Sequence, residues 1–318
     1  MPVLYLSEDD VRQLVTMDMA LEAVEAAFRK LSLDEADNIP RHRCQTDGAV
    51  LHVLSATVKT LGAIGLKAYT TSKAGAQFHV FLYDPNAGGL VAILAADYLG
   101  QVRTGAASGV ATKRLARRDA ASLGLYGTGK QARTQLLAIS KVRQLKTVKV
   151  FGRDANRRTQ FASEMSKLCD IEVTPVNTPE EAARGLDVVT TATSSREPVL
   201  MGEWLAAGAH LNLVGSNFLG KTEVDLEVLR RATHVFVDSK EQAKMEAGDF
   251  VAALREGVLN WANVTELSHV ITGRYPGRQS PEDVTLFKSL GLGVQDVALG
   301  VRVLQAARKN GVGVELPF

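Results

Sequence analysis

The feature that most constrains this chain is a glycine turn, Tyr126-Gly127-Thr128-Gly129-Lys130-Gln131-Ala132, which follows a strand-like run and opens a helix-like run. In a turn of this kind Gly127 permits the sharp reversal of the backbone, and Gly129 lets the backbone approach a pyrophosphate. The first N–H groups of the helix, at Lys130 and Gln131, suit an anion. The turn therefore predicts a parallel sheet that binds a dinucleotide, with these four residues contacting the cofactor.

The region around and after this turn alternates short apolar runs with amphipathic stretches, as repeated strand–helix units do. Six runs are expected to be strands: 122–126, 148–151, 171–173, 188–192, 210–214 and 234–237. Helical patterns lie between them at 131–139, 155–168, 179–183 and 225–230. The predicted fold class is α/β, with a Rossmann-type, doubly wound parallel sheet as NAD(P)-binding domain over residues 118–293.

The first part of the chain has a different pattern, which indicates a smaller α+β domain. Ser7 and Asp10 form a capping pair before a helix predicted over 8–32, and helices are also expected at 99–117 and 297–307. A meander, antiparallel at least in part, is expected from strands at 50–54, 64–69, 78–83 and 90–94, with a turn at 84–89. Residues 1–117, with 294–318 returning to them, are assigned to this substrate-binding and dimerisation domain.

Charge and composition exclude several classes of protein. The 37 Lys and Arg nearly balance the 35 Asp and Glu, and a net charge of +2 lacks the basic surface of a nucleic-acid binder. No run approaches the roughly 18 apolar residues of a membrane span, and the start lacks a signal peptide, so a cytoplasmic protein is expected. Cys44 and Cys169 lie far apart without a CxxC or a His cluster, so both are expected to be reduced and buried, with no metal site.

The end of the second expected strand bears on the choice of cofactor. An acidic residue there accepts the ribose 2′-hydroxyl of NAD, whereas this chain has Gly152-Arg153. Arg153, helped by Arg157 or Arg158, suits a 2′-phosphate, so NADP(H) is favoured and NAD(H) stays open. Asp154 is the counter-argument, because its carboxylate could reach a ribose.

Several ordered segments resemble one protein family over nearly the whole chain. They are Ile39-Pro40-Arg41, Gly65-Leu66-Lys67, Gln101-Val102-Arg103-Thr104-Gly105-Ala106-Ala107-Ser108, the Gly127 turn, Val214-Gly215-Ser216-Asn217, Lys221-Thr222-Glu223 and Thr285-Leu286-Phe287-Lys288-Ser289-Leu290-Gly291. Together they resemble the ornithine cyclodeaminase/mu-crystallin family. Its members include ornithine and lysine cyclodeaminases, an archaeal type of alanine dehydrogenase and ketimine reductases, and the resemblance implies a homodimer formed through the non-Rossmann domain.

Three cations from three segments of the first domain are candidate substrate ligands. Arg41, Lys67 and Arg103 suit an α-carboxylate, because a guanidinium holds it bidentately and an ammonium adds a point charge. The matching positions of the family bind that carboxylate. Arg43 shares a face with Arg41 in an extended segment and is the alternative ligand. Thr104 resembles the family's cofactor-contacting threonine, and Ser289 in the last segment is also assigned to the cofactor.

Two departures from the family favour reduction over cyclisation. The cyclodeaminases carry an aspartate base where this chain has Asn217, and a carboxamide cannot take up a proton at neutral pH. The ornithine enzymes place a glutamate for the distal amine where this chain has His52, which is assigned to the substrate site but is a poor anchor for an ammonium.

The resulting hypothesis is an NAD(P)H-dependent reductase of imines that carry a carboxylate. Cyclic ketimines such as pyrroline-2-carboxylate or piperideine-2-carboxylate, or α-imino acids, would give L-amino acids such as proline. Asn217 would orient the substrate nitrogen, and the proton would come from solvent, from Lys67 or from an already protonated substrate. The alternatives are an ornithine or lysine cyclodeaminase, an alanine-dehydrogenase-like enzyme, and a non-catalytic NADPH-dependent ligand-binding protein.

Overall fold

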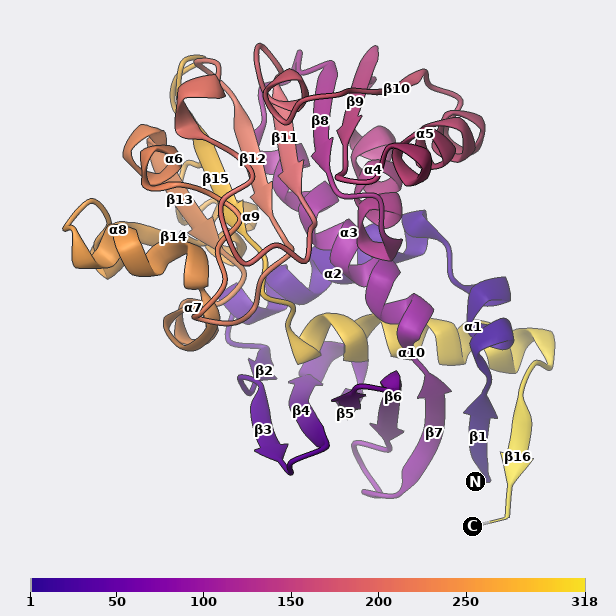
Figure 1. The fold of residues 1–318 in the computed structure, drawn as a ribbon. Helices are drawn as coiled ribbons and strands as arrows, with labels where there is room; N and C mark the ends of the chain where they lie inside the picture. The colour runs from indigo at the N-terminus through magenta and orange to yellow at the C-terminus, as the bar shows by residue number, and fades with distance from the viewer. Residues whose placement is uncertain (1, 318) are drawn as a thin grey trace. The chain divides into compact units, whose positions relative to one another are not determined.

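The computed structural model describes residues 2–317, which form two compact units (Figure 1). Unit 1 comprises Met1–Arg103 and Gly291–Phe318, and unit 2 comprises Thr104–Leu290. The division falls inside helix α3 (Asp97–Leu115), whereas the sequence suggested residue 117. The second half of α3 belongs to unit 2 because Thr112 accepts a hydrogen bond from Asn212 of the unit 2 sheet at 3.0 Å.

Unit 1 is built on an eight-stranded sheet in the order β16-β1-β7-β6-β5-β4-β2, with β3 also paired to β4. The strands are β1 (Val3–Leu6), β2 (Ala36–Asn38), β3 (His42–Gln45), β4 (Ala49–Val58), β5 (Ala63–Ser72), β6 (Gly75–Tyr83), β7 (Leu90–Ala95) and β16 (Val314–Leu316). The expected meander is β4 to β7, and all its pairs are antiparallel.

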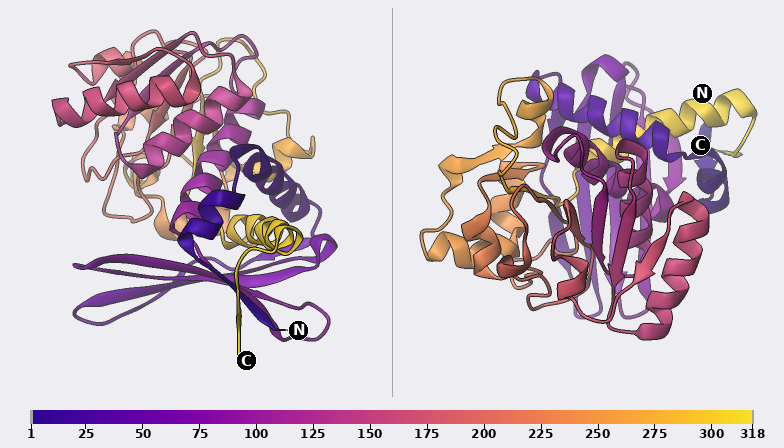
Figure 2. Two further views of the ribbon diagram at one scale, coloured as in Figure 1. Left: turned by 90° about the vertical axis from the view of Figure 1, so that its right-hand side faces the viewer. Right: turned by 90° about the horizontal axis from the view of Figure 1, so that it is seen from above.

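Helices α1 (Glu8–Leu14), α2 (Met17–Ser32) and α10 (Gly293–Asn310) lie on one face of this sheet (Figure 2, left). Helix α10 packs on β4, β5 and β6. No helix of unit 1 lies on the opposite face within the described chain. Because neighbouring side chains of a strand point to opposite faces, Lys67 and Leu82 are buried on the helix side, whereas Leu66 and Phe81 pair on the other side and are half-buried.

The prediction of one helix over 8–32 was wrong, because the chain breaks between α1 and α2. Val15 is extended, with φ −80° and ψ 124°, and ends α1. The Thr16 hydroxyl then accepts the N–H of Met19 and starts α2 as its N-cap. A β-branched pair with a capping hydroxyl therefore outweighed the continuous apolar pattern.

Unit 2 contains a parallel eight-stranded sheet in the order β10-β9-β8-β11-β12-β15-β13-β14, which confirms the predicted α/β class. The strands are β8 (Ser122–Tyr126), β9 (Thr147–Phe151), β10 (Val173–Pro175), β11 (Val188–Thr191), β12 (His210–Leu213), β13 (His234–Val237), β14 (Val264–Glu266) and β15 (Thr285–Lys288). Two of these strands were not predicted from the sequence. β14 has only three residues, and β15 runs into a glycine-containing loop. No helical pattern was recognised between these two strands.

Helices pack on both faces of this sheet, so adjacent residues such as Val188 and Val189 enter different apolar clusters. The helices are α4 (Lys130–Val142), α5 (Ala155–Cys169), α6 (Leu226–Arg231), α7 (Lys240–Glu246), α8 (Val251–Arg255) and α9 (Leu267–Ile271). Short 3-10 turns occur at Glu180–Ala182, Gly202–Trp204, Gly248–Phe250 and Trp261–Asn263, and one at Lys59–Leu61 of unit 1. The helix expected at 179–183 is only the first of these turns.

Two further sequence expectations concern the surface. Both cysteines are free, but Cys44 is exposed and Cys169 only half-buried, so their expected burial was wrong. Within residues 2–317, no helix is both long and apolar enough to cross a membrane.

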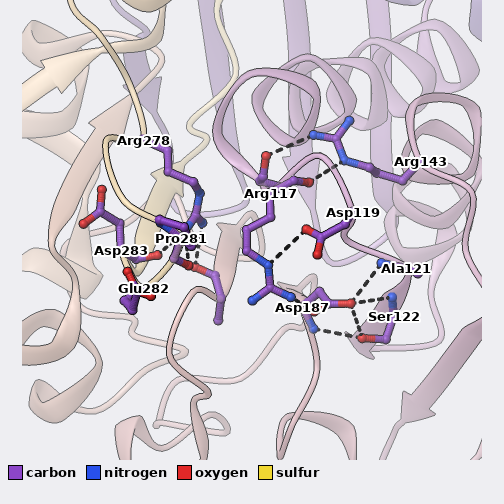
Figure 3. A network of polar contacts seen from close by, with 12 residues as sticks. Arg117, Asp119, Ala121, Ser122, Arg143, Asp187, Arg278, Pro281, Glu282 and Asp283 are labelled. Atoms are coloured by element: carbon purple, nitrogen blue, oxygen red, sulfur yellow. Dashed lines mark hydrogen bonds and ion pairs between the residues drawn. The ribbon is translucent and has the colours of Figure 1, made fainter.

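Two arginines cap the carboxyl end of α3 (Figure 3). Arg143 donates to the carbonyls of Thr112 at 2.8 Å, Ala116 at 3.1 Å and Arg117 at 3.1 Å. Arg278 donates to the carbonyl of Leu115 at 2.7 Å. Burial lowers the pKa of both arginines. The two guanidiniums bind carbonyls of the last turn of α3 and of the residues that follow it, and a cation also suits the negative end of the helix dipole.

We expect Arg143→Ala to lower the free energy of unfolding by about 2 kcal/mol, because several carbonyls lose a charged donor. Chemical denaturation followed by circular dichroism measures the change. The matched control is Arg133→Ala on α4, which removes an exposed ion pair with Glu164 and should have little effect. Equal effects of the two substitutions would contradict the capping role.

Candidate active site

The glycine turn of unit 2 lies at the carboxyl end of β8, where the strand order reverses between β8 and β11. Open α/β sheets bind ligands at such a point. Gly127 has φ 112°, and a β-carbon there would lie 2.4 Å from the carbonyl oxygen of Ala192. Its N–H donates to the carbonyl of Phe151 at 2.8 Å. Only glycine fits this position, because strands on both sides confine the backbone.

The N-terminus of α4 fits the pyrophosphate of a dinucleotide. Its N-cap is Gly129, which supplies no side-chain hydrogen bond, and a β-carbon there would meet no atom within 4 Å. Lys130 is exposed, and Gln131 is half-buried with no hydrogen-bond partner for its Oε1 among residues 2–317. The first N–H groups of an α-helix have no acceptor within the helix, and beside open space they suit an anion.

The residues after β9 differ in their availability to a 2′-phosphate. Arg153 and Arg157 are exposed. Arg158 is buried, and it donates to the carbonyl of Gly152 at 2.7 Å and to Asn177 at 2.9 Å, so it is committed to the fold. Asp154 caps α5 by accepting the N–H of Arg157 at 3.0 Å. Its carboxylate thus has a structural task, and Arg153 is the first exposed charge after the strand.

In unit 1, Lys67 and Arg103 meet at one buried carboxylate, Asp296. The Lys67 Nζ is 2.8 Å from Asp296 Oδ1, and the Arg103 Nε is 3.1 Å from the same oxygen. Arg103 also donates to Gln295 Oε1 at 3.2 Å. Lys67 comes from β5, Arg103 from α3, and Asp296 from the first turn of α10, where the helix dipole stabilises an anion.

Two glycines leave room for these cationic groups. A β-carbon at Gly100 would lie 2.7 Å from Lys67 Nζ, and one at Gly291 would lie 2.6 Å from Arg103 Nη1. Arg41 donates to the carbonyl of Gly291 at 3.1 Å. The structure therefore brings Arg41, Lys67 and Arg103 together around Gly291 and Asp296, three cations about one carboxylate.

These charges shift the pKa values of the cluster. Burial lowers the pKa of Lys67 to about 8, with Asp296 opposing the change and Arg103 and Arg41 adding to it. Burial alone would raise the pKa of Asp296, but Arg103 and Lys67 outweigh it and lower that pKa. Around neutral pH the cluster consequently contains an ionised carboxylate and a mostly protonated Lys67, which suits the binding of a further anion.

Arg43 and His52 lie beside the cation cluster, on the face of the unit 1 sheet that carries Lys67. Arg43 pairs with His52 across β3 and β4, and His52 pairs with Tyr69 of β5. The His52 and Tyr69 rings stack at 4.2 Å, and His52 Nε2 lies 3.1 Å from the Thr71 hydroxyl. Lys67 Nζ is 5.9 Å from the centre of the Tyr69 ring. His52 therefore belongs to a ring stack beside the cation cluster.

The remaining candidates lie in unit 2. Asn217 is half-buried in the loop after β12. Ser289 follows β15 and is buried, with no hydrogen-bond partner for its hydroxyl among residues 2–317. Thr104 is buried, and its carbonyl accepts from Gln135 at 3.3 Å. No group of three or more His, Cys, Asp or Glu within the described chain is arranged to hold a metal ion.

Sequence reasoning assigned no role to Asp296, Gln295, Gly100 or Gly291. The expected helix began at 297, one residue after the carboxylate that both Lys67 and Arg103 contact. A signal was present, because Gln295 and Asp296 are polar residues on a helix whose neighbours Val294 and Val297 are apolar. The role of Asp296 depends on its contacts with Lys67 and Arg103, which lie 229 and 193 residues away in the chain.

Comparisons with known proteins place this chain among related enzymes. The sequence profile of the ornithine cyclodeaminase/mu-crystallin family matches residues 3–311. The Δ1-pyrroline-2-carboxylate reductase of Bacillus cereus is 32% identical over 330 residues, which cover 99% of this chain and 100% of that protein.

Two solved structures have nearly the same fold. The Thermococcus litoralis Δ1-pyrroline-2-carboxylate reductase, in complex with NADH and L-proline, has a TM-score of 0.94 and 32% identity, covering 99% of this chain and 100% of that one. An archaeal alanine dehydrogenase, solved as a dimer with bound NAD, has a TM-score of 0.94 and 34% identity over 100% of both chains.

We expect Lys67 to titrate near pH 8 in the protein without substrate. The measurement is a pH titration of protein labelled with ¹³C at the lysine ε-carbon, followed by NMR, with Lys67→Met identifying the resonance. In Asp296→Asn the midpoint should move below 8, because that carboxylate favours the ammonium form. A midpoint that stays the same or rises in Asp296→Asn would contradict this account.

Proposed function

Because the chain belongs to the ornithine cyclodeaminase/mu-crystallin family, we propose that it is a reductase of imines that carry a carboxylate. The protein belongs to the NAD(P)-dependent oxidoreductases that act on C=N bonds. The proposed substrates are cyclic ketimines such as Δ1-pyrroline-2-carboxylate and piperideine-2-carboxylate, or α-imino acids. One hydride and one proton add across the C=N bond, and the products are an L-amino acid and the oxidised cofactor.

The observation that carries this proposal is the cation cluster of unit 1. Arg41, Lys67 and Arg103 are each buried, and Asp296 offsets only one of their charges. A substrate carboxylate is the anion that this cluster would accept, with an arginine providing paired N–H donors and Lys67 a point charge. Fixing the carboxylate orients the adjacent imine carbon, which lowers the entropy cost of the reaction.

Asn217 and Lys67 are proposed to act on the substrate nitrogen. The Asn217 carboxamide can orient the nitrogen by hydrogen bonding but cannot serve as a base, which favours reduction over the cyclodeaminase reaction. With a pKa of about 8, Lys67 is mostly protonated at neutral pH and is a candidate proton donor. Solvent and an already protonated imine are the other sources.

The cofactor is proposed to be NADP(H), held by Gly127, Gly129, Lys130, Gln131, Thr104 and Ser289, with Arg153 on the 2′-phosphate. When bound in reduced form, it supplies the hydride for the imine carbon. Exposure of Arg153 supports this preference, as does the use of Asp154 as a helix cap. The two related structures described above contain NADH and NAD, so NAD(H) is the alternative.

A homodimer is proposed to form through the face of the unit 1 sheet that lies opposite α10. Leu66, Phe81 and Ile93 form one row across β5, β6 and β7 on that face and are half-buried, and Leu51 is exposed. A contiguous apolar sheet face of this kind is typical of an interface between protein chains.

The deciding assay follows absorbance at 340 nm with NADPH and Δ1-pyrroline-2-carboxylate, and piperideine-2-carboxylate and NADH are tested in parallel. Rapid oxidation of the cofactor with formation of L-proline is expected. Ornithine with NAD⁺ tests the cyclodeaminase reaction through proline and ammonia, and L-alanine with NAD⁺ tests the dehydrogenase reaction. Turnover in either of those arms, without imine reduction, would replace the proposal with that activity.

We expect Arg153→Ser to lower kcat/KM for NADPH by about 10- to 100-fold, because a charged hydrogen bond contributes about 1.5–3 kcal/mol. The same variant assayed with NADH is the control and should change less than about twofold, since NADH lacks the phosphate. Equal losses with both cofactors would show that Arg153 does not read the 2′-phosphate.

We expect Phe81→Glu to convert the dimer to a monomer, because it places a charge in the middle of the apolar row. Analytical ultracentrifugation measures the change. Gln77→Glu is the matched control, since Gln77 lies on the same strand and face but is exposed near its end. A monomeric wild-type protein, or a Phe81→Glu dimer, would refute this interface.

A further inference from the structure

The loop that carries Asn217 runs from Ser216 to Thr222 and contains no helix or strand. Its tip is open to solvent, with Phe218 43% and Leu219 52% exposed. Apolar burial therefore does not hold the tip in place, whereas the Ser216 hydroxyl donates to the carbonyls of Phe218 at 3.3 Å and Lys221 at 3.1 Å within the loop, and buried charges anchor its two ends.

The first anchor is Glu223, a fully buried carboxylate directly after the loop. Its Oε1 accepts the N–H and the hydroxyl of Thr193, both at 2.7 Å. Its Oε2 accepts the Thr191 hydroxyl at 2.8 Å and the N–H of Gly215 at 2.7 Å. Each oxygen thus accepts two donors, and the carboxylate joins the end of β11 to the residue that precedes the loop.

The second anchor is a buried ion pair between Asp249 and Lys288. Lys288 Nζ lies 2.8 Å from Asp249 Oδ2 and donates to the carbonyl of Ser216 at 2.6 Å. Asp249 Oδ1 accepts the N–H of Glu223 at 2.7 Å and the Thr222 hydroxyl at 3.2 Å. One ion pair thus binds the first residue of the loop through Lys288 and its last residue through Asp249.

Two glycines allow the backbone to approach these anchors. A β-carbon at Gly215 would lie 2.4 Å from Glu223 Oε1. At Gly248, a β-carbon would lie 2.0 Å from the carbonyl oxygen of Lys221 and 2.4 Å from that of Phe218. The loop backbone is thus packed directly on Gly248, next to the ion pair.

Two carboxylates and one ammonium buried together are costly to desolvate, so stability alone gives little reason to keep them. Burial raises the pKa of Glu223, and Lys288 opposes that change. The cluster instead fixes the position of the loop backbone, because its hydrogen bonds end on backbone groups at both ends of the loop, namely at Gly215, Ser216 and Glu223. Positional precision of that kind is what a reacting group requires.

We propose that Glu223, together with Asp249 and Lys288, is a positioning residue that fixes the loop 216–222 and thereby the side chain of Asn217. The effect of this positioning on turnover rests on the proposed imine reduction. The fixation of the loop is independent of that function. The two parts are therefore tested separately.

The structural test is hydrogen–deuterium exchange of the peptide that spans residues 214–223, in wild type and in Glu223→Gln. Glutamine keeps the shape, but its NH₂ group replaces one oxygen and faces two donors. Exchange in this peptide should rise at least fivefold in Glu223→Gln. Unchanged exchange overturns the proposal, and this arm decides it even if the wild-type protein reduces no imine, in which case the proposed function fails separately.

The kinetic test uses the NADPH-dependent reductase assay. Glu223→Gln should lower kcat at least tenfold with less than a threefold change in KM for NADPH. If Glu223 acts through Asn217, the same substitution in an Asn217→Ala background should change kcat less than threefold. An undiminished kcat in the single variant, or an equal loss in both backgrounds, overturns the positioning role.

Asp187→Asn is the matched control for both tests. Asp187 accepts the N–H groups of Ala121 and Ser122 and the Ser122 hydroxyl, and it pairs with Arg117, so it also has several donors (Figure 3). It precedes β11, whereas Glu223 binds residues at the carboxyl end of that strand. The control should lose stability but leave loop exchange and kcat unchanged. Changes equal to those of Glu223→Gln would mean a general structural effect and overturn the proposal.

Discussion

The ion cluster of Lys67, Arg103 and Asp296 is the interaction on which the proposed substrate binding in unit 1 depends. One carboxylate oxygen accepts from both cations, so a strand, a helix and the return segment of the chain meet at a single atom. Removing the carboxylate would leave two buried cations uncompensated, which is far more costly than losing a surface pair. Asp296 lowers the charge of the cluster without cancelling it, and the remaining positive charge explains why the site suits a carboxylate.

Unit 2 also contains a buried cluster of charged side chains, but its proposed role is different. Glu223, Asp249 and Lys288 are buried and their hydrogen bonds end on backbone groups at both ends of a loop, which they are proposed to fix. In both units small residues make the arrangement possible. Gly100 and Gly291 leave room for cationic head groups, while Gly215 and Gly248 let the backbone approach buried oxygens. Both buried charge clusters therefore depend on neighbouring glycines as much as on the charged residues themselves.

The sequence predicted local structure well where one signal dominated. The β8–turn–α4 unit and the β4–β7 meander formed as expected, because strand periodicity and glycine turns agree there. It was wrong at residues 8–32, where the Thr16 cap outweighed a continuous apolar face, and it missed β15, whose neighbours β12 and β13 lie far away in the chain. Cap strength and strand insertion depend on contacts that a local pattern does not contain.

For the candidate site, the sequence by itself determined the chemical groups, namely three cations, a carboxamide in place of an acid, and a glycine turn for a dinucleotide. Only the tertiary structure decided which of them meet. It joined Arg41, Lys67 and Arg103 at Gly291 and Asp296, committed Arg158 to the fold, and set the pKa of Lys67 to about 8. Residue identity fixes what a side chain can donate or accept. Burial and charge proximity, which set its protonation and availability, exist only once distant segments have packed together.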